Sequence, residues 1–253
     1  MAKPKQEFVQ QLRSHFDGLK FRYELFQENK LATDRFLATD FNVFAYIQPD
    51  EPKLSHIIGD LLNPKGGHGQ STVFLSKFLE ILRPASDSDK ADVDMPRQAL
   101  MSALRGPIDR VQVDVGRERP TDRIERSQRR MDITVTINGG ALAIENKPWS
   151  GDPESQLEDI GRHLEKGYKG KYVLVYLSGD DIRPPKSSLS PQRRNELRRM
   201  GHYFEISYPK EFRAWLECCR KECEAENVRS FLRDFGDYVE QNFRFALQED
   251  RDD

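Results

Sequence analysis

The chain has 253 residues, of which 37% are hydrophobic and 32% charged, with a formal net charge of −2 at pH 7. This length and hydrophobic content are sufficient for a buried core. No apolar run approaches the ~20 residues of a membrane helix and no signal peptide is evident, so we expect a cytoplasmic protein that makes no contact with the membrane. A net charge this small excludes a uniformly basic protein, so any surface that binds nucleic acid must be local.

Helices are predicted for the first third of the chain. Residues 5–83 carry apolar side chains three and four positions apart, which is the spacing of one helix face. The first such face consists of Phe8, Leu12, Phe16, Leu19, Tyr23 and Phe26. Residues 85–97 are polar and predict a linker. We therefore expect an N-terminal helical region, residues 1–84, packed on a core of residues 99–253, with both parts forming one compact domain.

A sheet flanked by helices is predicted for the rest of the chain. Residues 111–115 alternate between apolar and polar and predict a strand, and a hairpin follows at 131–147. The apolar run 172–177 is typical of a buried parallel strand, and residues 202–206 predict an edge strand. Helices are expected from Pro153 onwards and over residues 209–225 and 228–247.

The hairpin, MDITVTINGGALAIENK at residues 131–147, determines which side chains share a face of the sheet. Its Asn-Gly pair at 138–139 is the strongest short signal for a two-residue type I′ turn. Pairing outwards from this turn sets Asp132 opposite Glu145, and Lys147 shares the face of Glu145 because the two are two positions apart. The opposite face is apolar and consists of Ile133, Val135, Ile137, Leu142 and Ile144.

Two carboxylates and an ammonium at one strand end suit metal-dependent hydrolysis of a phosphodiester. Carboxylate oxygens suit Mg²⁺, which aligns the attacking water and offsets negative charge in the transition state, and Lys147 would position that water or stabilise the charge. The alternative is a surface ion pair worth ~0–1 kcal/mol. Glu-x-Lys occurs three times in the chain, so the strand context carries the nuclease interpretation.

Like charges on Asp132 and Glu145 also oppose their joint ionisation. On the hairpin register alone, we expect Glu145→Gln to raise the stability of the metal-free protein and to abolish any stabilisation by metal.

Two further segments offer polar side chains to such a site. Gln156 lies in the first turn of the helix that starts at Pro153, where its amide could bind the attacking water or a phosphate; a solvated surface glutamine is the alternative. In the glycine-rich segment 63–70, His68 and Gln70 could approach a phosphate or the metal-bound water. The alternative there is a structural loop with a hydrogen-bonded His68.

In their order along the chain, these segments resemble the PD-(D/E)XK nuclease superfamily, and within it a bacterial and archaeal group of nuclease-like proteins. The matching segments are SHIIGDLLNPKGGHGQ (55–70), RMDI (130–133), AIENK (143–147), DPESQL (152–157), ISY (206–208) and WL (215–216). The resemblance implies an α/β fold with a restriction-endonuclease-like core. This core is a central mixed β-sheet (αβββαβ) flanked by helices, with N- and C-terminal helical additions.

The resemblance and the hairpin together favour a Mg²⁺-dependent nuclease acting on DNA, with Mn²⁺ able to substitute. In this hypothesis Asp132, Glu145 and the main-chain carbonyl of Asn146 hold the metal, Lys147 acts on the water, and Gln156 supports it. Pro148 stands where related sequences have an apolar residue, which predicts that the strand ends abruptly after Lys147.

Contacts to nucleic acid are expected from Arg130, His68 and Gln70. Arg130 ends a basic segment, residues 117–130, that leads directly to Asp132. Many superfamily members also contribute an acidic residue from an early helix, and the sequence does not rank the candidates. These are Glu51, Asp60, Glu80 and Glu118.

A second class of function stays open at this point, namely a non-catalytic nucleic-acid-binding or assembly subunit that keeps the nuclease fold. Either activity would suit the effector of a prokaryotic defence or restriction system. In such a system DNA, a protein partner from a multi-subunit complex, or a second copy of the chain are the expected partners. The intact Asp132, Glu145 and Lys147 favour the enzyme.

Overall fold

The computed structural model describes residues 3–38, 41–82, 94–115, 131–149, 156–180 and 183–243. The strands are β1 (Val111–Val115), β2 (Ile133–Ile137), β3 (Gly140–Lys147), β4 (Tyr172–Ser178) and β5 (Tyr203–Ser207). The α-helices are α1 (Lys3–Leu37), α2 (Val43–Ile47), α3 (Glu51–Leu62), α4 (Val73–Ile81), α5 (Met95–Ala103), α6 (Gln156–Tyr168), α7 (Pro191–Arg199), α8 (Arg213–Glu222) and α9 (Glu226–Asn242). A 3-10 turn, Ile108–Arg110, precedes β1, and a π-helical turn, Tyr208–Phe212, leads from β5 into α8.

The strands form one mixed sheet in the order β1-β2-β3-β4-β5. β1, β2 and β3 are antiparallel neighbours, while β3, β4 and β5 run parallel and are connected through α6 and α7. The expected α/β class is therefore confirmed. The hairpin register is also confirmed, because Ile137 pairs with Gly140 and Ile133 with Ile144. The turn has positive φ at Asn138 (45°) and Gly139 (82°), as a type I′ turn requires.

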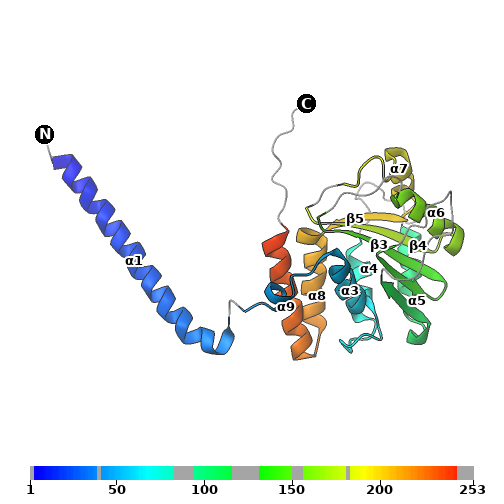
Figure 1. The fold of residues 1–253 in the computed structure, drawn as a ribbon, viewed down its shortest axis with the longest axis horizontal. Helices are drawn as coiled ribbons and strands as arrows, with labels where there is room; N and C mark the ends of the chain where they lie inside the picture. Colours follow the sequence, from blue (N-terminus) through cyan, green and yellow to red (C-terminus); the bar gives the residue numbers. More distant parts are fainter. Residues whose placement is uncertain are drawn as a thin grey trace. The chain divides into compact units, whose positions relative to one another are not determined.

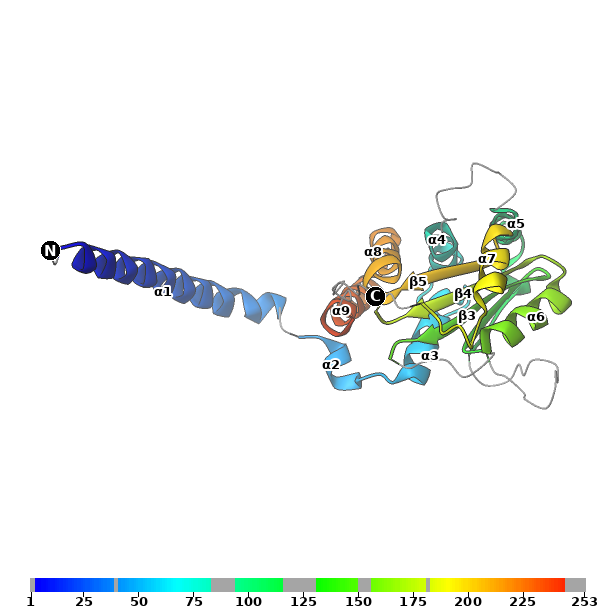
Figure 2. The ribbon, with the colours of Figure 1, turned by 90° about the horizontal axis from the view of Figure 1, so that it is seen from above.

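Helices cover both faces of this sheet (Figures 1 and 2). One face packs on α3, α4, α5, α8 and α9 and contains the apolar hairpin residues expected from the register, Ile133, Val135, Ile137, Leu142 and Ile144. The other face packs on α6 and α7 around Ala141, Ala143 and Leu174. Because β3 and β4 are buried along their whole length, a charged residue at either strand end must find its partners within the protein.

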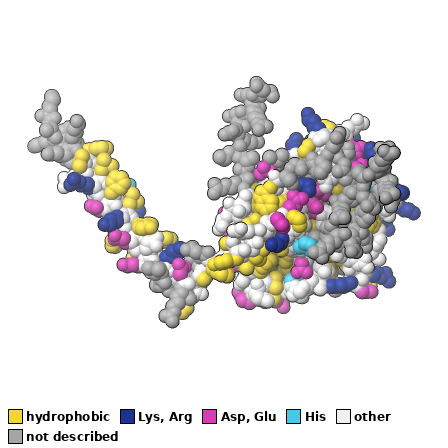
Figure 3. Space-filling view, in the orientation of Figure 1, with side chains coloured by type: hydrophobic (Ala, Val, Ile, Leu, Met, Phe, Trp, Pro, Cys, Tyr) yellow, Lys and Arg dark blue, Asp and Glu magenta, His cyan; other side chains and the backbone are white. Residues whose placement is uncertain are grey.

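The chain divides between Asn42 and Val43 into two compact units, residues 1–42 and 43–253. Helices α2, α3 and α4, which belong to the N-terminal helical region expected over residues 1–84, are thus grouped with the sheet. The packing of residues 1–42 on the core stays a prediction. Within the first unit, the six apolar residues that define one face of α1 are each at least 40% exposed, and hydrophobic side chains follow the part of this helix that is coloured by residue type in Figure 3.

Several element boundaries differ from the sequence-based expectation. The linker predicted over residues 85–97 is wrong in its last part, because α5 begins at Met95. The helix expected over residues 209–225 begins as a π-helical turn and ends at Glu222. The start of the helix from Pro153 and the end of the helix expected to reach residue 247 lie outside the described residues. Of the helices that the structure describes, none has the length and apolar character needed to cross a membrane.

Candidate active site

Lys147 lies at the centre of a cluster of acidic side chains. Its Nζ is 2.7 Å from Oε1 of Glu145, 3.0 Å from Oε1 of Glu51 and 3.6 Å from Oδ2 of Asp132. The lysine side chain is only 7% exposed and that of Glu145 is fully buried. The structure thus brings together Asp132, Glu145 and Lys147, as the hairpin register predicts, and adds Glu51. We call these four side chains the acidic cluster.

The end of β3 is held in place by backbone features on both sides. Pro148 has no N–H to continue the ladder, and β3 ends at Lys147, as expected. The carbonyl of Lys147 accepts a hydrogen bond from the N–H of Gly179, 3.1 Å away, just beyond β4. A Cβ on Gly179 would lie 1.8 Å from the Pro148 carbonyl oxygen, so the two strand ends can approach this closely only with glycine at this position.

Glu51 reaches the cluster because α3 begins at this residue. Asp50 caps the helix, accepting a hydrogen bond from the N–H of Lys53 at 2.9 Å, and Pro52 occupies the first turn, where its missing N–H costs nothing. Among the candidates for the early acidic residue, Glu51 is the one that the structure places at Lys147. Asp60 is exposed, Glu80 is exposed and paired with Lys77, and Glu118 lies outside the described residues.

Gln156 lies where the sequence placed it, at the start of α6 beside the cluster. Its Nε2 donates to Oε1 of Glu145 at 2.5 Å, the same oxygen that contacts Lys147. The Gln156 side chain is buried, and its Oε1 has no hydrogen-bond partner in the part of the chain that the structure describes. A buried amide oxygen of this kind is available to accept a hydrogen bond from a water or another donor in the site.

Burial and neighbouring charge shift the protonation equilibria of the cluster. Burial raises the pKa of Asp132 above its ordinary value, although the Lys147 ammonium and the N–H of Asn146, which donates to Asp132 Oδ2 at 2.8 Å, act in the opposite direction. Burial alone would lower the pKa of Lys147, but the carboxylates of Glu145 and Asp132 outweigh it and raise this pKa. The side chain of Lys147 therefore stays protonated and positively charged at neutral pH. Within the cluster, three carboxylates face one ammonium, which leaves two negative charges in excess when all four are ionised.

The donor chemistry of the cluster fits a hard divalent cation. In the described ranges no group of three or more His, Cys, Asp and Glu side chains is arranged to hold a metal ion, because the carboxylates are directed at Lys147. Mg²⁺, however, is typically bound through only one or two carboxylates, with waters and substrate phosphate completing its shell. The carboxylates of Asp132 and Glu145 could supply such ligands, and the excess negative charge of the cluster would attract a cation.

A family model of the PD-(D/E)XK nuclease superfamily matches residues 41–237. The chain belongs to this superfamily. The matched region begins just before α2 and ends within α9, so it covers the sheet, both helical layers and the acidic cluster. No curated protein and no solved structure matches the chain. Membership indicates a nuclease, while the metal and the substrate are not identified by this match.

His68 and Gln70 lie in the loop after α3, at the opposite end of this roughly 18 Å helix from Glu51. His68 Nδ1 accepts from the N–H of Gln70, so Nε2 carries the proton and donates to the carbonyl of Asn63 at 2.8 Å. The Gln70 amide donates to the carbonyl of His68 and accepts from the N–H of Glu224. Both side chains therefore make hydrogen bonds within the protein. Their contact with nucleic acid stays a prediction. Arg130 and the basic segment 117–130 lie outside the described residues.

Sequence reasoning assigned no role to the contacts of the Asn146 side chain. Its amide donates to Ser55 Oγ at 2.9 Å and accepts from Tyr208 Oη at 2.8 Å. Burial raises the pKa of Tyr208 well above its ordinary value, so this phenol stays protonated. Ser55 and Tyr208 both lie in segments that carry the superfamily resemblance, but only the folded chain shows that they meet at Asn146.

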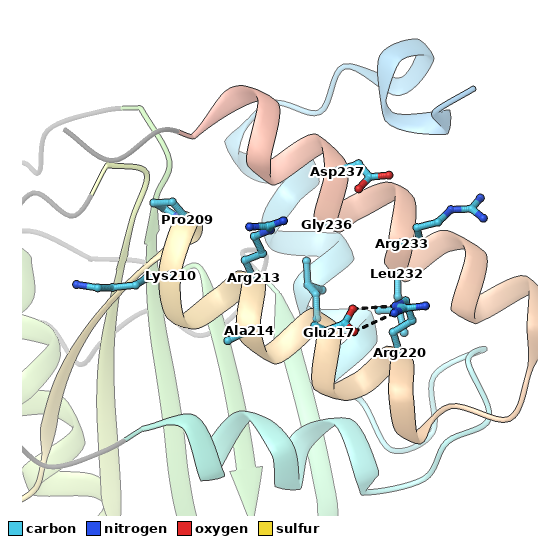
Figure 4. A pocket seen from close by; sticks show the side chains of 11 residues that line it. Pro209, Lys210, Arg213, Ala214, Glu217, Arg220, Leu232, Arg233, Gly236 and Asp237 are labelled. Carbon is cyan, nitrogen blue, oxygen red and sulfur yellow. Dashed lines mark hydrogen bonds and ion pairs between the residues drawn. The ribbon is translucent and has the colours of Figure 1, made fainter. Parts of the chain in front are cut away.

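A separate groove of about 530 Å³ lies between α8 and α9 (Figure 4). Its basic side chains include Arg213, Arg220 and Arg233, which form ion pairs with Glu240, Glu217 and Asp234 respectively. Because these cations are already neutralised by neighbouring carboxylates, the groove does not offer the concentrated positive charge that a phosphate backbone requires. The acidic cluster is therefore the better candidate for the active site.

Proposed function

We propose that the chain is a Mg²⁺-dependent nuclease that hydrolyses phosphodiester bonds of DNA in the cytoplasm, with Mn²⁺ able to replace Mg²⁺. The observation that supports this most strongly is the acidic cluster at the end of β3. Glu145 and Lys147 lie two positions apart on one strand, and Asp132 lies directly before the neighbouring strand β2. A structural ion pair would need one carboxylate, whereas three are directed at a single ammonium.

In this proposal Asp132, Glu145 and the carbonyl of Asn146 would hold the metal. When bound, the metal would activate a water and offset the negative charge that develops on the phosphate. Lys147, kept protonated by its carboxylate neighbours, would stabilise the same charge from the protein side. The amide oxygen of Gln156 would accept a hydrogen bond from the attacking water and so orient it.

DNA would reach the site by the basic segment 117–130, with Arg130 closest in sequence to Asp132. Among the described residues of the second unit, side chains of both charges are scattered over the visible face in Figure 3, which agrees with a local rather than a global basic surface. We further propose that the nuclease is the effector of a prokaryotic defence or restriction system, acting with a protein partner or as a homo-oligomer.

The test is a cleavage assay on single-stranded, nicked and duplex DNA and on RNA, with Mg²⁺ or Mn²⁺. We expect Glu145→Gln and Lys147→Met to lower the rate of DNA cleavage at least 100-fold. The matched controls are Glu217→Gln and Lys77→Met, which alter exposed ion pairs on α8 and α4 and should cleave like the wild type. If both cluster variants cleave DNA as fast as the wild type, the assignment of Glu145 and Lys147 to the active site is wrong.

The competing proposal is a non-catalytic nucleic-acid-binding or assembly subunit that keeps the fold. One observation favours it, namely that Lys147 occupies the point on which the carboxylates converge. Calorimetric titration with Mn²⁺ separates the two proposals. The nuclease predicts saturable binding that Glu145→Gln abolishes, whereas a silent titration of folded protein, with and without DNA, would favour the subunit.

A further inference from the structure

A chain of buried hydrogen bonds joins three segments on the side of β3 opposite Glu145 and Lys147. Tyr208 Oη donates to Asn146 Oδ1 at 2.8 Å, Asn146 Nδ2 donates to Ser55 Oγ at 2.9 Å, and Ser55 Oγ donates to the main-chain oxygen of Glu51 at 3.0 Å. All three side chains are at most 3% exposed. We call this the Tyr208–Asn146–Ser55 chain.

The direction of these hydrogen bonds is determined by the hydroxyl of Ser55. Its single hydrogen is donated to the Glu51 carbonyl, so Ser55 can only accept from Asn146. The amide of Asn146 must therefore present its nitrogen to Ser55 and its oxygen to Tyr208. Rotating the amide by half a turn would face its oxygen toward Ser55 and withdraw the donor that Ser55 requires. Each bond in the chain thus depends on the next.

The chain connects to the acidic cluster at its Ser55 end and through Asn146 in its middle. At one end it ties the first turn of α3, which carries Glu51, to β3. In the middle, Asn146 lies between Glu145 and Lys147 in sequence, and its own N–H donates to Asp132 at 2.8 Å. Asn146 therefore lies in β3 beside Glu145 and Lys147, and it contacts both Asp132 and the helix α3 that carries Glu51.

Packing alone does not require these polar groups. Helix α3 already buries Leu54, Ile58 and Leu62 in the main core, and apolar residues could fill the same volume without the cost of burying hydroxyl and amide groups. The apolar face selects the side of α3 that faces the core, but apolar contacts are not directional and leave small rotations of the helix about its axis cheap. Hydrogen bonds are directional and restrict these rotations.

We infer that the Tyr208–Asn146–Ser55 chain positions the first turn of α3 on β3 so that the carboxylate of Glu51 meets Lys147. Tyr208, Asn146 and Ser55 are positioning residues, which act on the cluster through Glu51 and touch neither metal nor substrate with their side chains. The catalytic consequence rests on the proposed function, whereas the coupling between Tyr208 and Glu51 is a property of the metal-free protein.

The first experiment is a double-mutant cycle on urea unfolding without metal. Tyr208→Phe removes the hydroxyl and keeps the ring stacked on Phe243 at 4.3 Å. Tyr238→Phe is the matched control, because it removes a hydroxyl from another largely buried tyrosine of the same aromatic group. We expect the cost of Glu51→Gln to fall by at least half in the Tyr208→Phe background and to be unchanged in the Tyr238→Phe background.

Equal costs of Glu51→Gln in all three backgrounds would overturn the inference. If Tyr208→Phe does not fold, Ser55→Ala breaks the chain at its other end and should give the same result in the same cycle. The second readout is the Mn²⁺ dissociation constant measured by electron paramagnetic resonance. We expect Tyr208→Phe to weaken binding roughly tenfold, Tyr238→Phe to leave it unchanged, and Glu51→Gln to add nothing to Tyr208→Phe.

The two proposals fail in different ways. A wild type that binds no Mn²⁺ contradicts the proposed function, and the unfolding cycle then decides the positioning inference by itself. A wild type that binds Mn²⁺ with an affinity that Tyr208→Phe does not change contradicts the positioning inference while the nuclease proposal stands.

Discussion

Oε1 of Glu51 lies 3.0 Å from Nζ of Lys147, although the two residues are 96 positions apart in the sequence. The contact joins the first turn of α3 to the last residue of β3. It thereby completes a cluster in which carboxylates from a helix and from two hairpin strands face one ammonium.

Removing the charge of Glu51 should weaken metal binding. Glu51→Gln keeps an oxygen that can accept from Lys147 but lowers the excess negative charge of the cluster by one. Because Glu51 acts on the proposed ligands through Lys147, we expect the Mn²⁺ dissociation constant to rise roughly tenfold. Glu80→Gln, which alters the exposed pair with Lys77, is the control. Equal affinities for both variants would contradict a role for Glu51.

Neutralising Asp132 should stabilise the metal-free protein near neutral pH. Burial raises the pKa of Asp132, so between its ordinary value and the raised value the folded state binds more protons than the unfolded state. The free energy of unfolding then falls as the pH rises through this window. Asp132→Asn removes this loss and still offers an oxygen to the N–H of Asn146.

We expect Asp132→Asn to raise the free energy of unfolding at pH 7 by up to about 1 kcal/mol and to flatten its dependence on pH in that window. Urea unfolding at several pH values measures both effects. The exposed Asp109, changed to Asn, serves as the control and should alter neither. A lower stability of Asp132→Asn at pH 7 would contradict the charge arrangement described for the cluster.

Glu145→Gln should have the opposite effect on the metal-free protein. The hairpin register alone predicts a gain in stability from this change, but the structure revises that expectation. Oε1 of Glu145 accepts from both Lys147 and Gln156 in a fully buried position, so the buried ammonium would lose its nearest counter-charge. We expect a loss of about 1–3 kcal/mol in the free energy of urea unfolding, together with loss of any stabilisation by Mn²⁺. A gain in stability would show that repulsion from Asp132 dominates.

A methyl group at Gly179 should disturb the strand end that carries Lys147. The added Cβ of Gly179→Ala would lie 1.8 Å from the Pro148 oxygen, and this oxygen belongs to the backbone and cannot rotate away. We expect a loss of about 1–3 kcal/mol or more in thermal unfolding, with reduced cleavage. Gly167→Ala in α6 is the matched control, since nothing lies within 4 Å of its added Cβ, and it should be neutral or stabilising. Equal melting temperatures would contradict the close approach of the two strand ends.

The hairpin could be predicted from sequence because its determinants are local. The Asn-Gly pair fixes the turn, the turn fixes the register, and the two-residue period of a strand then places Asp132, Glu145 and Lys147 on one face. The position of Gln156 could also be predicted, because α6 begins nine positions after Lys147 and the apolar face of this helix determines how it lies on the sheet.

The other parts of the site depend on packing between distant segments. Nothing local distinguishes Glu51 from Asp60 or Glu80, since all three lie on exposed or half-exposed parts of helices, and only the docking of α3 on the sheet selects one. The buried partners of Asn146 are determined in the same way. Helix α5 was missed because it is short and buries only Pro96 and Leu100, which is too few apolar positions to produce a helical period.

A divalent cation is expected to bind between Asp132 and Glu145 and to support cleavage there. The anomalous scattering of Mn²⁺, in crystals of the wild type soaked with Mn²⁺ and a short DNA duplex, would locate this cation. We predict one strong peak within about 2.5 Å of carboxylate oxygens from both residues, with a phosphate oxygen in its shell. A map with no peak at these carboxylates, in crystals of protein that cleaves DNA in solution, would contradict the account.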